Sequence, residues 1–184
     1  ERNFSQFRIK AETAGGLLNT LATNYNVVKT NNNKNKIFGV EYAQYAKAEL
    51  DFIKHWPLGQ QSSLAFRSFF GIAVPYWNSD NIPFSQSYFA GGTTDNRGWK
   101  AYHLGPGAIQ SILDYNEANM KLTLNLEYRF PVLGALKGAL FTDVGNIWNV
   151  ADSTPLEENK FKNLASFQDI GLSTGLGMRY DFNF

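Results

Sequence analysis

The strongest constraint on the fold is a strict alternation of apolar and polar residues from Met120 to Phe130. Successive side chains of a β-strand point to opposite faces of the sheet, whereas a helix would group its apolar residues three or four positions apart. The pattern therefore predicts a strand with one apolar face and one face suited to water or charge. The apolar set is Leu122, Leu124, Leu126, Tyr128 and Phe130, and the polar set is Thr123, Asn125, Glu127 and Arg129.

Weaker forms of this alternation recur along the chain and predict six strands, near residues 4–21, 37–53, 63–76, 120–130, 136–148 and 169–182. The connections between them alternate in length. Those near 24–36, 77–119 and 149–168 are long, and those near 56–62 and 131–135 are short. Outer-membrane barrels have short periplasmic turns and long extracellular loops, whereas a soluble sandwich has no reason to keep one end bare. The sequence therefore predicts an all-β fold and a transmembrane antiparallel β-barrel.

The composition agrees with a barrel wall. Aromatic residues make up 15% of the 184 residues. Charged residues make up 18%, below the roughly 25% that is usual in soluble domains. A net charge of +1 gives no basic surface for nucleic acid, and no apolar run approaches the about 18 residues of a transmembrane helix. The absence of cysteine fits an envelope protein.

The longest glycine-rich segment, Tyr88–Gly107, reads YFAGGTTDNRGWKAYHLGPG and separates two groups of expected strands. Glycine tolerates positive φ and close approach of backbones, so this segment can fold back into a confined space. Arg97 stands at its centre, and a guanidinium group must be satisfied by water or by a carboxylate. A solvated surface loop is the alternative, because most loops lie on protein surfaces.

The GG…RGW…LGPG pattern resembles the sixth extracellular loop of the bacterial surface antigen (BamA/TamA) superfamily of outer-membrane barrels, and most of all its TamA-like members. In that family an (I/V)RG(F/Y) tip folds back into the barrel lumen, where its arginine meets an acidic residue of a neighbouring strand. The resemblance implies a lumenal loop over residues 77–119, with a tip formed by Arg97, Gly98 and Trp99. Asn96 stands where the family usually has an aliphatic residue.

A second block, LKGALFTDVGNIW over 136–148, resembles the G-x-F-x-D-x-G strand of the same family. The resemblance implies that Asp143 is the partner of Arg97 in a buried ion pair. The alternative is that Asp143 satisfies a turn at the end of a strand while Arg97 is solvated. The supporting glycines implied in the same way are Gly91, Gly92 and Gly145.

The last expected strand carries glycines on its polar side. Glycine inside a strand often marks a place where another backbone approaches closely. This favours room for a lumenal loop over a phosphate-binding site. The glycines are Gly171, Gly175 and Gly177.

Barrels of this family have sixteen strands, and the loop joins the eleventh to the twelfth. The six expected strands then correspond to strands nine to fourteen. An open sheet of six strands would leave two unpaired edges, which lipid cannot solvate. Residues 1–184 are therefore expected to be part of one barrel domain, a fragment that lacks the first eight strands, the last two and the N-terminal periplasmic domains.

The resemblance implies a non-enzymatic factor that inserts or translocates proteins at the bacterial outer membrane. Its partners would be outer-membrane lipid, unfolded outer-membrane or secreted proteins, and periplasmic or inner-membrane accessory proteins. His55 and His103 lie in turn or loop contexts without a G-x-S-x-G motif, so no catalytic residue, cofactor or metal is expected. A two-partner secretion transporter, a passive porin and a soluble all-β binding module stay open as alternatives. The porin and the soluble module leave the RGW and F-x-D blocks unexplained.

Overall fold

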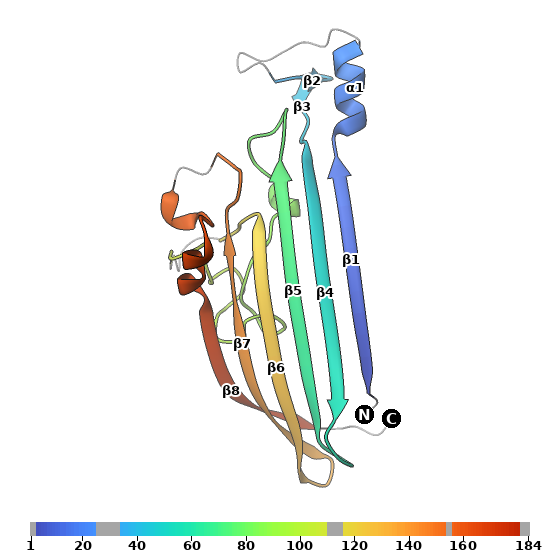
Figure 1. The fold of residues 1–184 in the computed structure, drawn as a ribbon, viewed down its shortest axis with the longest axis vertical. Coiled ribbons are helices and arrows are strands. Elements are labelled where there is room, and N and C mark those ends of the chain that lie inside the picture. The colour runs from blue at the N-terminus through green and yellow to red at the C-terminus, as the bar shows by residue number, and fades with distance from the viewer. Residues whose placement is uncertain (1–2, 25–33, 110–115, 154–155, 181–184) are drawn as a thin grey trace.

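The computed structural model describes residues 3–24, 34–109, 116–153 and 156–180. Six long antiparallel strands form one curved sheet in the order β1-β4-β5-β6-β7-β8 (Figure 1). Each long strand pairs with the next long strand along the chain, as in a barrel wall. The strands are β1 (Phe4–Ala14), β4 (Tyr45–Pro57), β5 (Ser63–Pro75), β6 (Met120–Leu133), β7 (Leu136–Trp148) and β8 (Gly171–Tyr180).

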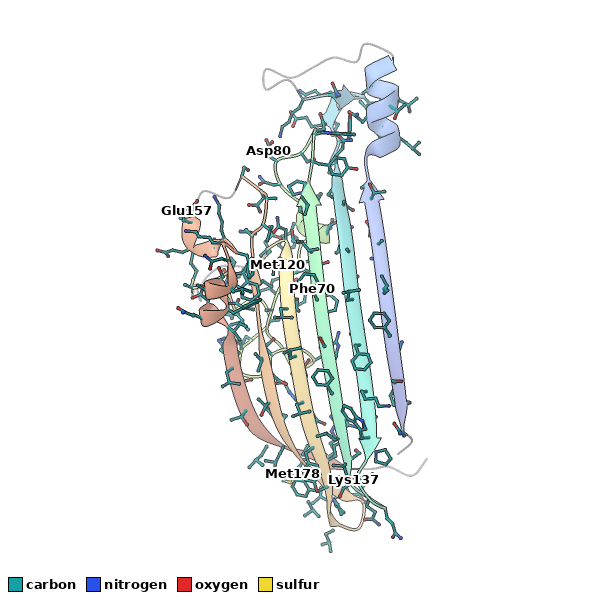
Figure 2. All side chains as sticks on the ribbon, viewed as in Figure 1. Phe70, Asp80, Met120, Lys137, Glu157 and Met178 are labelled. Atoms are coloured by element: carbon teal, nitrogen blue, oxygen red, sulfur yellow. The ribbon has the colours of Figure 1, made fainter. Side chains whose placement is uncertain are left out.

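The two faces of the sheet differ as the alternation predicts. Side chains project from both faces along its length (Figure 2). We call the face that carries Asn125 and Asp143, which pair in the register of β6 and β7, the inner face. The inner face buries polar side chains and the outer face exposes apolar ones, the reverse of a soluble protein and the arrangement of a membrane barrel. Exposed outer residues include Leu50, Leu126, Leu140, Leu172, Leu176 and Met178.

The connections keep their alternation in length. Short turns at 58–62 and 134–135 lie at one end of the sheet, together with the start of β1 and the end of β8 (Figure 1). The longer connections lie at the other end and carry short elements. These are α1 (Gly16–Asn24), β2 (Lys36–Ile37), β3 (Val40–Glu41), η1 (Phe84–Gln86), η2 (Glu157–Asn159) and η3 (Leu164–Asp169). No helix within the described residues is both long enough and apolar enough to cross a membrane.

The expected strand at 4–21 is wrong beyond Ala14. Gly15 has a φ of 77°, which ends the strand, and helix α1 follows it directly. The spacing of Leu17, Leu18 and Leu21 fits a helix face, because these residues lie one and four positions apart. The chain therefore changes from strand to helix at Gly15.

The expected strand at 37–53 also begins too early. Residues 36–41 form a separate hairpin of β2 and β3, in which Lys36 pairs with Glu41. Phe38 and Gly39, both with positive φ, make its turn. β4 begins only at Tyr45 and continues to Pro57. The other strands lie close to the expected ranges; β6 extends to Leu133, and the last residues of the strand expected at 169–182 lie outside the described residues.

Candidate functional site

The segment expected to form the lumenal loop packs against the inner face of the sheet. Tyr88 bridges to Ala118 and Ala90 bridges to Leu104, so the segment doubles back on itself. Part of it contributes to a small buried cluster on the inner face, against which Phe69, Ile82 and Trp99 pack. The buried members are Ala73, Tyr88, Ala90, Leu104, Ala118 and Ile147.

The tip of the loop is a closed turn. The backbone N–H of Gly92 donates to the carbonyl of Trp99 at 2.8 Å, and the N–H of Trp99 donates to the carbonyl of Asn96 at 3.2 Å. Gly91 and Gly92 have φ values of 98° and 105°, which favour glycine. A Cβ at Gly91 would also collide with the carbonyl of Lys100. These two glycines therefore shape the tip that carries Arg97.

Arg97 and Asp143 meet on the inner face. The Arg97 Nε and Nη2 atoms donate to the two Asp143 carboxylate oxygens, each at 2.8 Å, and the Arg97 backbone N–H adds a third bond at 3.0 Å. The Asp143 side chain is fully buried. The bonds to Asp143 raise the pKa of Arg97 above its ordinary value, so the guanidinium stays charged. This bidentate geometry fixes the orientation of the tip as well as its position.

Glu127, which sequence reasoning did not single out, is a second partner of the arginine. Arg97 Nη1 lies 2.5 Å from Glu127 Oε2, and the other carboxylate oxygen lies 2.8 Å from both Arg129 and Arg179. Glu127 therefore joins the loop to β6 and β8. Its place on the polar side of β6 was visible in the sequence, but its partners depend on the register of the strands.

The inner-face glycines make the room that the tip occupies. A Cβ at Gly171 would contact the ring of Trp99, and one at Gly175 would strike the ring of Phe141. The Arg97 guanidinium lies 3.7 Å from the centre of that Phe141 ring, a cation–π contact. Gly177 differs, because a Cβ there would meet only Ala139, at 3.7 Å.

The LGPG segment is held at the end of β7. Asn146 donates to the carbonyl of Gly107 at 2.9 Å, and the N–H of Gly107 donates to the carbonyl of Ile147 at 2.8 Å. No group of three or more metal-ligating His, Cys, Asp or Glu side chains occurs in the described part of the chain.

Asn96 is a weak point of the tip, and replacing it by valine is expected to stabilise the protein by about 1 kcal/mol. The residue is fully buried, and neither amide atom has a hydrogen-bond partner among the described residues. Valine removes this unsatisfied amide. The measurement is the urea midpoint of the full-length protein. Asn125→Val is the matched control and is expected to destabilise, because the Asn125 amide donates to Asp95 and Asp143.

Comparisons with known proteins agree with this architecture. A model of the Omp85 superfamily domain matches residues 18–184. The outer membrane protein assembly factor BamA of Neisseria meningitidis serogroup B is 29% identical over 116 residues, which cover 58% of this chain and 14% of that protein. The chain thus spans only a small part of this relative.

A solved structure has a similar fold. The crystal structure of BamA from Haemophilus ducreyi lacking POTRA domains 1–3 matches with a TM-score of 0.60 at 18% identity. The match covers 76% of this chain and 29% of that chain. At this identity the likeness concerns the fold alone.

Proposed function

The chain belongs to the Omp85 superfamily, and we propose that it is a section of the barrel of a factor that inserts or translocates proteins at the outer membrane. It is part of a bacterial outer-membrane protein. The observation that carries the proposal is the tip of the loop seated on the inner face by Arg97, Asp143 and Glu127. In this proposal residues 1–184 belong to one barrel domain, and the face that holds the loop lines its lumen.

The proposed role of the seated loop is mechanical and non-enzymatic. Arg97 ties the tip to β7 through Asp143 and to β6 through Glu127, and Glu127 in turn contacts Arg179 on β8. Three neighbouring strands are thus joined through their inner face. Such a brace keeps this part of the wall in one shape while other parts of a barrel handle a substrate. The proposed partners are outer-membrane lipid, unfolded outer-membrane or secreted proteins, and periplasmic or inner-membrane accessory proteins.

The test is an assembly assay with the full-length protein in liposomes. An unfolded outer-membrane β-barrel protein is added, and its folding is followed by its heat-modifiable mobility in gels. We expect folding to be faster than in liposomes that carry an unrelated outer-membrane barrel. Ion conductance without faster folding would contradict the proposal in favour of a porin. Export of one dedicated partner without faster folding would favour a two-partner secretion transporter.

A further inference from the structure

A second buried ion pair lies beside Arg97. Lys121 Nζ on β6 is 2.9 Å from Asp95 Oδ1 in the loop, and the two side chains are only 12% and 13% exposed. We propose that Asp95 and Lys121 form a second latch, an ion pair that holds the loop on the inner face independently of Arg97. The first latch is the contact of Arg97 with Asp143 and Glu127. The inference rests on the proposed function, which gives the seated loop its role.

The Asp95 carboxylate shapes the loop and attaches it at the same time. One of its oxygens accepts the backbone N–H of Gly91 at 2.9 Å, which closes the turn of the tip. The other accepts the hydroxyl of Thr123 at 3.3 Å in addition to the ammonium of Lys121. Loss of this carboxylate therefore loosens both the turn and its contact with β6.

Lys121 holds the loop at two points. Besides Asp95, its ammonium donates to the carbonyl of Phe89 at 2.7 Å. It also lies 5.5 Å from the ring centre of Phe89 and 5.9 Å from that of Phe69. A lysine with so little exposure needs partners for its charge, and here most of them come from the loop. The position of the loop on the inner face and the stabilisation of the Lys121 charge are therefore coupled.

Strand β6 contributes residues to both latches. Lys121, Thr123, Asn125 and Glu127 are alternate residues of β6 and share its inner face. The first two contact Asp95 and the last contacts Arg97. Asn125 links them, because its amide donates to the Asp95 carbonyl at 2.7 Å and to the Asp143 carboxylate at 2.9 Å.

The latches lie on the two sides of Asn96, whose buried amide has no partner in the described structure. Asp95 precedes it and Arg97 follows it, so each neighbour of the unsatisfied residue is anchored by charge. The two anchors hold the tip on both sides of Asn96. A single anchor would leave one side unsupported. Asp95 and Lys121 are therefore positioning residues for the tip.

A disulfide that forms only when the loop is seated tests the proposal. The chain has no cysteine, and a Cβ at Gly98 would lie 2.5 Å from the Cβ of Ser173 on β8. A small outward shift of the tip brings the two Cβ atoms to the roughly 3.5–4.5 Å separation of a disulfide. Gly98→Cys and Ser173→Cys are combined in the full-length protein, and the rate of disulfide formation under mild oxidation is measured. Arg97→Met is expected to slow the reaction and leave it measurable. Adding Lys121→Met is expected to slow it about tenfold further.

Lys10→Met is the matched control, because Lys10 lies on β1 and pairs with Glu12. Equal rates for Lys121→Met and Lys10→Met in the Arg97→Met background would overturn the second latch. If Arg97→Met does not fold, Arg97 is kept, and the labelling of Gly98→Cys by a water-soluble maleimide is compared between the other variants. Lys121→Met or Asp95→Asn is then expected to raise labelling about threefold, and labelling equal to that of Lys10→Met would overturn the proposal.

These measurements report the position of the loop, and the liposome assay reports assembly. If both latches hold the loop but the protein does not speed folding, the result contradicts the proposed function and supports the second latch. A protein that speeds folding but shows no effect of Lys121→Met would contradict the latch alone.

Discussion

Replacing Arg97 by methionine is expected to destabilise the protein by about 3–5 kcal/mol, because removal of one member of a buried ion pair leaves its partner uncompensated. Asp143 is fully buried and Glu127 nearly so, and both lose their contact with the guanidinium. Methionine keeps an apolar stem near Phe141, so lost packing contributes little. The measurement is the urea midpoint of the full-length protein in lipid.

Arg67→Met is the matched control for the loss of a cation from the inner face. Its side chain is 40% exposed, contacts Asp51 at 3.2 Å and donates to the carbonyl of Thr94 in the loop at 3.3 Å, so a cost of about 1 kcal/mol or less is expected. A double-mutant cycle of Arg97→Met and Asp143→Asn isolates the pair and is expected to give a coupling of about 1–3 kcal/mol. A coupling near zero would remove Arg97–Asp143 as an anchor of the loop.

Gly145→Ala is expected to cost about 2–3 kcal/mol by overpacking. A Cβ at this position would lie 2.6 Å from the carbonyl oxygen of Leu122 and 2.9 Å from Oδ1 of Asn96. The Leu122 carbonyl belongs to the neighbouring strand and cannot move aside without breaking the register. The strand or the loop tip must therefore shift. The measurement is again the urea midpoint, together with the rate of the Gly98→Cys/Ser173→Cys disulfide.

Gly177→Ala gives the control for a glycine of the inner face. A Cβ there would contact only Ala139, at an ordinary distance of 3.7 Å. A change within about 0.5 kcal/mol is expected. If Gly145→Ala and Gly177→Ala changed the free energy of unfolding equally, the space above Gly145 would not be filled by the tip as the structure has it.

The sequence was sufficient for the faces of the strands and insufficient for their partners. The period of two from Met120 to Phe130 assigns each side chain to a face, and the structure has the same assignment. The pairing of Asn125 with Asp143 depends on register, which the alternation leaves open by steps of two residues. For that reason the sequence places Glu127 on the polar face of its strand but does not predict its contact with Arg97.

Local signals explain the other differences. Leu17, Leu18 and Leu21 carry helical spacing, but they directly follow a strand pattern, which favours continuation of the strand to residue 21. Asp95 lies in a polar, glycine-rich stretch, where aspartate usually serves a turn. It does close the turn through Gly91, and its second role with Lys121 arises only once the loop lies on β6.

We expect the outer face of this sheet to meet lipid and the inner face to line an aqueous lumen. Single cysteines in native outer membranes test it most directly, at Leu126 and Leu176 on the outer face and at Ala65 and Gly177 on the inner face. These positions avoid the residues that hold the loop. We predict that lipid-soluble reagents label the leucine positions and that water-soluble reagents label Ala65 and Gly177. Equal access of a water-soluble reagent to all four positions would contradict it.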